Sequence, residues 1–244
     1  MRPNLTIAWL YGTKMNIYGD RGNVMALAQR AHWRGIEPEV VEIGIGAAMP
    51  DADIYFFGGG QDQEQVAVSR DLSGAKGDAL KANVAAGAAL LSVCGGYQLL
   101  GHEYRPYDRD PLPGIGLFDM VSEAGPERFI GNVVVESFLG ELVGFENHSG
   151  LTHLGPGLEP LGTVRVGRGN NGKDGTEGAV WRNAIGCYLH GALLPKNPVL
   201  ADWLIGAGLR HRHGDVSLAD LGPLDDTVEL AAHRTGVARA VRTR

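Results

Sequence analysis

Residues 90–101, LLSVCGGYQLLG, place a lone cysteine between a short apolar run and two glycines. Residues 89–93 have the length and composition of a buried strand, and residues 97–100 resemble the first turn of an amphipathic helix. Cys94 therefore stands at a predicted corner between a strand and a helix. A nucleophile at such a corner is lifted clear of the sheet, and the backbone N–H groups that follow can stabilise a developing oxyanion.

The neighbours of Cys94 favour this interpretation. Gly95 and Gly96 leave room for a substrate, and a helix N-terminus favours the thiolate form of cysteine. An isolated cysteine among apolar residues is usually a small buried hydrophobe, and Cys187, in IGCYLHG with no following glycine pair, fits that description. Two cysteines are too few for a secreted disulfide framework, so we expect both thiols to be reduced.

A cysteine nucleophile needs a base, and two of the eight histidines are candidates. His190 ends an apolar strand and precedes Gly191, so its ring can reach the sheet edge that carries Cys94. His148, in FENHSG, is the rival. The other histidines occupy polar or helical segments, where a solvent-facing side chain is the simpler interpretation: His32, His102, His153, His211, His213 and His233.

The elements that must position these residues alternate in a β–α–β order over residues 1–100. We expect strands in LTIAWLY, EVVEIG and DADIYFFGGG, and helices in NVMALAQRAHWRG and around residues 61–72 and 76–86. This alternation predicts an α/β fold with three layers, in which helices cover both faces of a central, mostly parallel sheet.

After Gly101 the chain changes to short apolar segments separated by turn residues, which predict a mixed β extension of that sheet. NPVLADWLIGAGLRHR predicts a returning helix, with Asn197 as an N-cap before Pro198. We therefore expect one domain over residues 1–210 and a C-terminal helical appendage or tail over residues 211–244. The segments of the extension are GIGLFDMV, FIGNVVVES, ELVGFENH, EPLGTVRVG, GAVWR and AIGCYLHG.

Composition limits the kind of protein. A chain of 244 residues with 44% hydrophobic residues can bury a full core. Its net charge of -6 argues against a nucleic-acid surface, and we assign no chemistry to the basic segment AAHRTGVARAVRTR. The sequence has neither the features of a signal peptide nor a run as long as a membrane span. We expect a soluble protein of the cytoplasm.

Several motifs together resemble the class I glutamine amidotransferases of the cobyric acid synthase (CobB/CobQ) type: VCGGYQLLG, FFGGGQDQEQ, FENHSG and YLHG. With YGDRGNVMAL and GRGNNGKDGTEG, they more narrowly resemble GatD, the glutaminase subunit of lipid II isoglutaminyl synthase. The resemblance covers residues 5–207 and implies the flavodoxin-like class I amidotransferase fold.

The resemblance also implies the chemistry. Glutamine would be hydrolysed to glutamate and ammonia through a thioester on Cys94, with His190 as the base. The oxyanion hole would consist of Gly59, Gly60 and the N–H of Gly95.

Arg128 matches the residue with which the family holds its substrate. The planar guanidinium suits this role because it pairs bidentately with a carboxylate. Without the family, Arg128 would be an ordinary surface arginine at the start of RFIGNVVV.

One part of the wider class I pattern is missing. There, a glutamate follows the histidine after one intervening residue, whereas here His190 is followed by Gly191 and Ala192. The site is therefore a dyad, or it takes an acid from elsewhere in the fold or from a partner. A partner's acid beside His190 would couple hydrolysis to assembly. The sequence leaves open whether the turn at residues 18–23 contacts substrate or only caps a helix.

The ammonia must be used by an ATP-dependent step, and the sequence shows no motif for ATP binding. The segments GDRGN and GGGQ both lack the Lys-Ser/Thr ending of a P-loop. The resemblance implies a heterodimer with a MurT-like synthetase subunit of the Mur ligase type. That partner would use ATP and Mg²⁺ to activate the D-glutamate α-carboxylate of lipid II for amidation in peptidoglycan synthesis. We expect no cofactor or metal in this chain, and a complex in the cytoplasm that reaches the inner face of the membrane.

Three other functions stay open at this point. The chain could be a cobyrinic-acid-type amidotransferase subunit. It could also be a stand-alone γ-glutamyl cysteine hydrolase that acts on peptides without a partner. A non-catalytic subunit that only retains the fold would carry an inert thiol at Cys94.

Overall fold

A computed structural model gives the structure of residues 3–214 and 216–243, so residues 1, 2, 215 and 244 of the two predicted domain ranges lie outside the described residues. The central sheet has six strands in the order β11-β12-β4-β3-β1-β2, all parallel to their neighbours except β11, which is antiparallel to β12. The strands are β1 (Asn4–Leu10), β2 (Glu37–Ile43), β3 (Ile54–Phe57), β4 (Ala89–Val93), β11 (Ala179–Trp181) and β12 (Ala184–Cys187).

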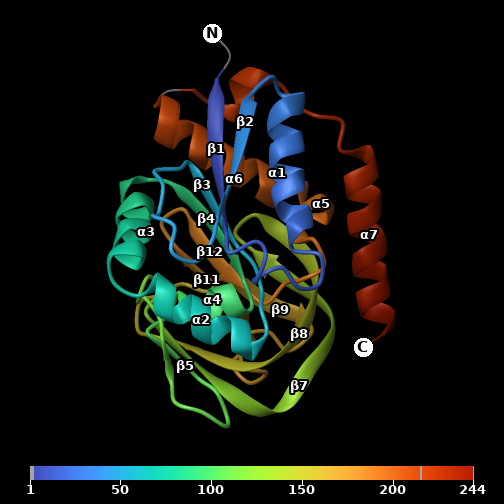
Figure 1. The fold of residues 1–244 in the computed structure, drawn as a ribbon. Coiled ribbons are helices and arrows are strands. Elements are labelled where there is room, and N and C mark those ends of the chain that lie inside the picture. Colours follow the sequence, from blue (N-terminus) through green and yellow to red (C-terminus); the bar gives the residue numbers. More distant parts are fainter. Residues whose placement is uncertain (1–2, 215, 244) are drawn as a thin grey trace.

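Helices cover both faces of this sheet. α1 (Arg21–Trp33) and α6 (Pro198–His213) contact each other on one face, and α2 (Asp62–Leu72) and α3 (Ala75–Ala86) lie on the other (Figure 1). Right-handed crossovers produce this arrangement, because the chain moves from β1 to β2 in one direction and from β3 to β4 in the opposite one. Every residue of β3 and β4 is buried, as expected for parallel strands covered on both faces. The predicted three-layer architecture is confirmed.

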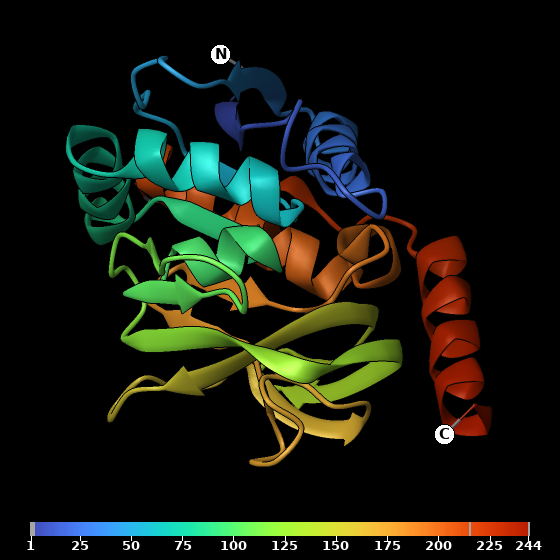
Figure 2. The ribbon, with the colours of Figure 1, turned by 60° about the horizontal axis from the view of Figure 1, so that its bottom comes forward.

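A second sheet lies beyond the carboxyl ends of the central strands, at the bottom of both views (Figures 1 and 2). Its main feature is a long antiparallel hairpin formed by β7 (Met120–Ser137) and β8 (Gly140–Leu154). The other strands are β5 (Glu103–Arg105), β6 (Leu112–Pro113), β9 (Gly162–Val166) and β10 (Thr176–Glu177).

The β extension differs from the prediction in two respects. Only GAVWR and AIGCYLHG join the central sheet, as β11 and β12, while the other segments contribute to the second sheet. FIGNVVVES and the end of GIGLFDMV belong to one strand, β7, whose pairing with β8 shifts register between Ala124 and Phe129. This bulge accommodates Gly125 and Pro126, which are typical of a turn.

The segment after α6 contacts both α1, which covers the central sheet, and the β7–β8 hairpin of the second sheet. The predicted boundary at residue 210 lies inside α6, and η1 (Leu218–Leu221) leads to α7 (Thr227–Arg242), which packs along the β7–β8 hairpin (Figure 2). Arg30 on α1 donates from Nη1 to Asp226 Oδ1 at 2.5 Å, immediately before α7. Near the other end, Ala240 packs with Val134, Val143 and Val166. No helix within residues 3–214 and 216–243 is long and apolar enough to cross a membrane.

Asn197 precedes α6 as predicted, with Pro198 in the first turn, but its side chain does not cap the helix. Instead, Oδ1 accepts the Val143 N–H at 2.9 Å, and Nδ2 donates to the carbonyls of Val143 and Leu193. Asn197 therefore joins the start of α6 to β8.

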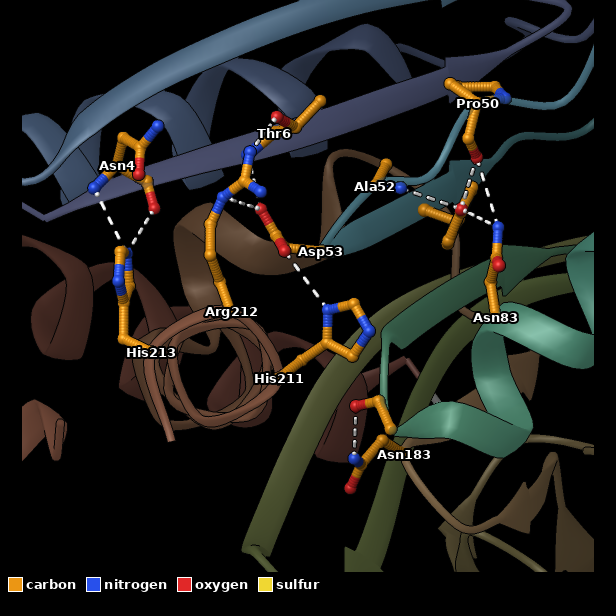
Figure 3. Close-up of polar contacts among 12 residues, drawn as sticks. Asn4, Thr6, Pro50, Ala52, Asp53, Asn83, Asn183, His211, Arg212 and His213 are labelled. Atoms are coloured by element: carbon orange, nitrogen blue, oxygen red, sulfur yellow. Dashed lines mark hydrogen bonds and ion pairs between the residues drawn. The ribbon is translucent and has the colours of Figure 1, made fainter. Parts of the chain in front are cut away.

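A buried carboxylate holds the far end of α6 to the central sheet (Figure 3). Asp53, next to the start of β3, accepts the Thr6 N–H at 2.7 Å through Oδ2, which also lies 3.1 Å from Arg212 Nε in an ion pair. Its Oδ1 lies 3.1 Å from His211 Nδ1. Each oxygen is partnered, which offsets the cost of burying a charge. These contacts lie at the amino ends of the inner strands β1 and β3, whereas Cys94 follows the carboxyl end of β4.

A second buried acid, Glu177 on β10, supports the chain segment that leads to His190. Its Oε1 accepts the Tyr188 N–H at 2.5 Å. Burial raises the pKa of Glu177 from its usual 4.5 to about 8. The folded protein therefore holds an extra proton between pH 4.5 and pH 8, and the stability linked to it is complete below pH 4.5 and is lost as the pH rises through 8.

Replacing Glu177 by glutamine should remove this pH dependence. The amide keeps a carbonyl acceptor for Tyr188 and has no charge to bury. We expect Glu177→Gln to unfold at higher urea concentration than the wild type at pH 8.5, by roughly 2–4 kcal/mol, because each pKa unit corresponds to ~1.4 kcal/mol. The difference should shrink at pH 5. An equal difference at both pH values would contradict the assignment of the proton to Glu177.

Candidate active site

Cys94 lies in a strained corner between β4 and α4 (Gly95–Leu99). Its backbone has φ +53° and ψ -110°, which a side-chain-bearing residue adopts only when the surrounding structure enforces it. Gly96 makes the corner possible, because a Cβ there would lie 2.6 Å from the Phe57 carbonyl oxygen. The geometry is that of a nucleophile elbow. Since α4 has only five residues, we attribute no effect on Cys94 to a helix dipole.

Cys94 lines a cavity of about 640 Å³ between the two sheets. The carboxyl ends of the central strands supply Cys94 and Gly60, and the β7–β8 hairpin supplies Arg128 and His148. This is where open α/β sheets generally bind ligands, and the volume suits a small molecule. The cavity therefore brings together Cys94, Gly60, Arg128 and the rival base His148, whereas His190, Gly59 and Gly95 are not among its lining residues.

His190 and Asp20 form a buried acid–base pair in the same region. Both side chains have 0% exposure, and Nδ1 of His190 lies 3.6 Å from Oδ1 of Asp20. This is an ion-pair distance but too long for a hydrogen bond, and neither atom has another hydrogen-bond partner among the described residues. Because Asp20 faces Nδ1, Nε2 remains as the nitrogen for the Cys94 thiol.

The charges around His190 favour its protonated form. Burial alone lowers the pKa of His190, but the negative charge of Cys94 and the nearby Asp20 carboxylate outweigh it and raise the pKa to about 10. A histidine close to a cysteine is the arrangement in which the imidazole activates the sulfur as a nucleophile. The structure therefore supports His190 as the base.

Asp20 is the functional residue that the sequence analysis misses. It stands immediately before α1, where an aspartate normally caps the helix. Here Asn16 Oδ1 accepts the Arg21 N–H at 2.8 Å, and Asp20 caps nothing. Its Oδ2 instead accepts the Gly59 N–H at 2.6 Å. Of the possible sources of an orienting acid, the structure thus offers one from the fold itself, in the turn at residues 18–23.

The glycine turn after β3 provides fewer free donors than predicted. The Gly59 N–H is already bound by Asp20, so it is not available for an oxyanion. No hydrogen bond within the described residues uses the N–H of Gly60 or Gly95. A Cβ on Gly95 would lie 3.2 Å from the Gly60 nitrogen, so these two N–H groups are neighbours. Gly60 and Gly95 are therefore the oxyanion donors that the geometry supports.

His148, the rival base, has a setting that opposes base catalysis. Its ring stacks on Tyr188 with centroids 3.6 Å apart and planes 7° apart. Nδ1 lies 2.8 Å from the Gly150 carbonyl oxygen, to which it must donate. Burial lowers the pKa of His148 to about 3, so the ring stays neutral at physiological pH. No other histidine lines the Cys94 cavity as the structure describes it.

The other predicted residues lie as follows. Arg128, on β7, is exposed and lines the cavity, with Nη1 donating to Asn147 Oδ1 at 2.8 Å. Cys187 is a free, fully buried cysteine, and burial raises the pKa of its thiol well above the usual value. Its interpretation as a small buried hydrophobe is confirmed.

Residues 6–198 match the family described as the CobB/CobQ-like glutamine amidotransferase domain. The chain belongs to this family. Its fold agrees: PurLQS from Thermotoga maritima superposes with a TM-score of 0.57 at 14% sequence identity, covering 86% of this chain and 98% of that chain.

Two relatives of this amidotransferase carry the same description, lipid II isoglutaminyl synthase (glutamine-hydrolyzing) subunit GatD. The protein of Staphylococcus aureus strain N315 is 43% identical over 204 residues, which are 82% of this chain and 83% of the relative. The protein of Streptococcus pneumoniae strain ATCC BAA-255 / R6 is 37% identical over 220 residues, covering 88% of this chain and 84% of the relative.

In this amidotransferase we expect Arg128→Ala to weaken glutamine use while leaving the nucleophile intact. Loss of one charged hydrogen-bonding partner of the substrate should lower kcat/KM for glutamine roughly 10- to 100-fold. Alkylation of Cys94 by iodoacetamide, which has no carboxylate, should keep its rate. If both glutamine hydrolysis and the alkylation of Cys94 were lost, Arg128 would instead support the fold.

Proposed function

We propose that this chain is the glutaminase subunit of a lipid II isoglutaminyl synthase. The observation that carries the proposal is the strained Cys94 in one cavity with Arg128, beside the buried pair of His190 and Asp20. Two relatives that each align with more than four-fifths of the chain support the choice of pathway. The same two relatives favour lipid II over cobyrinic acid as the molecule that is finally amidated.

In the first half-reaction, Arg128 pairs with the α-carboxylate of glutamine and directs its carboxamide toward Cys94. The sulfur attacks the carboxamide carbon, and the negative charge that develops on oxygen is stabilised by the N–H groups of Gly60 and Gly95. His190 then donates its proton to the nitrogen. The C–N bond breaks, ammonia leaves, and a γ-glutamyl thioester remains on Cys94.

In the second half-reaction, water replaces ammonia. The neutral His190 removes a proton from the water as its oxygen attacks the thioester carbon, and the carbon–sulfur bond breaks to release glutamate and the thiolate. Asp20 holds the ring with Nε2 toward the reacting atoms and stabilises the imidazolium that forms in each step. Each cycle thus restores the starting thiolate and imidazolium.

The ammonia is consumed by a synthetase subunit in a heterodimer. The description of both relatives as subunits supports a partner. We propose a MurT-like partner of the Mur ligase type that holds ATP and Mg²⁺ and activates the D-glutamate α-carboxylate of lipid II. The complex works in the cytoplasm, at the inner face of the membrane where its lipid-linked substrate lies.

The test is to purify the chain with its native partner and to assay amidation of lipid II with glutamine labelled with ¹⁵N in the carboxamide. We expect label in the lipid II product only when ATP, glutamine and both subunits are present. Hydrolysis of γ-glutamyl peptides by the isolated chain, without use of free glutamine, would instead support a stand-alone hydrolase. Amidation of cobyrinic acid with no amidation of lipid II would support the cobyric acid type.

A further inference from the structure

One buried polar atom, on a residue that lines the cavity, has no role in the steps above. Nε2 of His148 is buried and has no hydrogen-bond partner among the described residues, although His148 lines the same cavity as Cys94 and Arg128. The side chain is 2% exposed. A buried polar atom without a partner is costly, so such an atom on a residue that lines a substrate cavity requires an explanation.

The hydrogen bonds of His148 determine what Nε2 can do. The Gly150 carbonyl can only accept, so the proton of the neutral ring is on Nδ1, and Nε2 carries a lone pair. Burial keeps the pKa near 3, so Nε2 does not gain a proton at physiological pH. Nε2 is therefore a hydrogen-bond acceptor and never a donor.

The ring is also held in place. Tyr188, on which it stacks, accepts a hydrogen bond from Gln98 Nε2 at 3.1 Å and shares another with Thr152 Oγ1 at 2.7 Å. Phe129 contacts the ring of His148 edge-on, with centroids 5.4 Å apart. The His148 ring cannot turn without breaking its contacts with Tyr188 and Phe129, so Nε2 is held in a fixed position as an acceptor.

His148 lies at the Arg128 end of the cavity. Phe129, which follows Arg128, is paired with His148 across the β7–β8 ladder. Arg128 itself is bonded to Asn147, the residue before His148. The two side chains also line the same cavity, and the positive charge of Arg128 is one of the causes that lower the pKa of His148, so a carboxylate held by Arg128 would lie in the neighbourhood of His148. In glutamine, the ammonium group is attached to the same carbon as that carboxylate.

We propose that Nε2 of His148 accepts a hydrogen bond from the α-ammonium group of the bound glutamine. The inference rests on the proposed function, because it takes glutamine as the substrate. The ammonium gives the orphaned acceptor a partner, while a substrate that lacks this group leaves it buried and unpaired. Discrimination of this kind is large where a site is built around a hydrogen bond. His148 thus selects free amino acids over acids that carry only the carboxylate and carboxamide.

The test compares L-glutamine with 5-amino-5-oxopentanoate, which differs only by lacking the α-amino group, using the full chain with its native partner. The variants are His148→Asn, whose amide can replace Nδ1 as a donor to Gly150 but supplies nothing near Nε2, and His148→Gln, whose longer side chain can present an acceptor there. The control is His153→Asn on the same strand, where the side chain is 53% exposed.

We expect His148→Asn to lower kcat/KM for glutamine ~10- to 100-fold and to change that for the deaminated analogue less than ~3-fold. His148→Gln should recover much of the preference, and His153→Asn should behave like the wild type. Equal losses on both substrates would overturn the inference. A wild-type complex that does not hydrolyse glutamine would instead contradict the proposed function.

A second measurement avoids the His148 variants and their folding. In the Cys94→Ser protein with ring-¹⁵N-labelled histidine, glutamine should move the Nε2 resonance of His148 toward the value of a hydrogen-bonded acceptor, and the deaminated analogue should not. If saturating glutamine leaves the resonance unchanged, the inference is wrong, whatever the kinetics of the variants.

Discussion

Replacing Cys94 by serine should abolish glutamine hydrolysis. A serine hydroxyl is much harder to ionise than a thiol, so it is a much weaker nucleophile at this position. Loss of a nucleophile that acts together with its base can reduce kcat by ~10⁶-fold. The measurement is release of ammonia and glutamate from glutamine by the protein with its partner.

Cys187→Ser is the matched control, because it makes the same substitution at the other cysteine, which is fully buried and does not line the cavity. Most activity should remain. A glutamine-like electrophile should add one label per chain, and peptide mass mapping should locate it on Cys94. A label on Cys187, or substantial hydrolysis by Cys94→Ser, would contradict the assignment of the nucleophile.

Asp20→Asn should lower kcat by ~10²–10⁴-fold with little change in folding. The amide can place an NH₂ group toward Nδ1 of His190, which selects the wrong ring tautomer and removes the negative charge that stabilises the imidazolium. It can still accept the Gly59 N–H through its remaining oxygen, so the turn should hold. The measurement is the glutaminase rate with the partner, together with the thermal unfolding temperature.

Asp226→Asn is a suitable control, because Asp226 also directly precedes a helix but pairs with Arg30 rather than with His190. It should keep a wild-type kcat. If Asp20→Asn also keeps a wild-type rate, the site works as a dyad. If neutralising an interface acid of the partner lowers kcat and Asp20→Asn does not, the orienting acid comes from the partner.

The fold was largely predictable from sequence because its signals are local. The apolar run of residues 89–93 and the glycine pair after Cys94 determine a buried strand and a tight corner with no help from distant parts of the chain. The second sheet was harder to predict. Gly125 and Pro126 indicate a turn locally, yet the long pairing of β7 with β8 carries the strand through them as a bulge.

Residues whose own chemistry defines their role could be predicted from the sequence. Residues whose role depends on a contact with a distant part of the chain could not. Cys94 and Arg128 lie in the same cavity. Asp20 was overlooked because an aspartate before a helix has a simple local explanation as a cap, and its contact with His190 spans 170 positions of sequence. The resemblance to the family implied Gly59 as an oxyanion donor, and only the fold shows that Asp20 occupies its N–H.

The position of Asp20 connects the base to the glycine turn that carries an oxyanion donor. One oxygen of its carboxylate faces His190, and the other holds the N–H of Gly59, whose neighbour Gly60 carries an oxyanion donor. Because a carboxylate is a rigid plane, rotating it or withdrawing it disturbs the base and the glycine turn in one movement. Proton transfer and oxyanion stabilisation therefore both depend on the turn before α1, and a change in this turn should affect the two together.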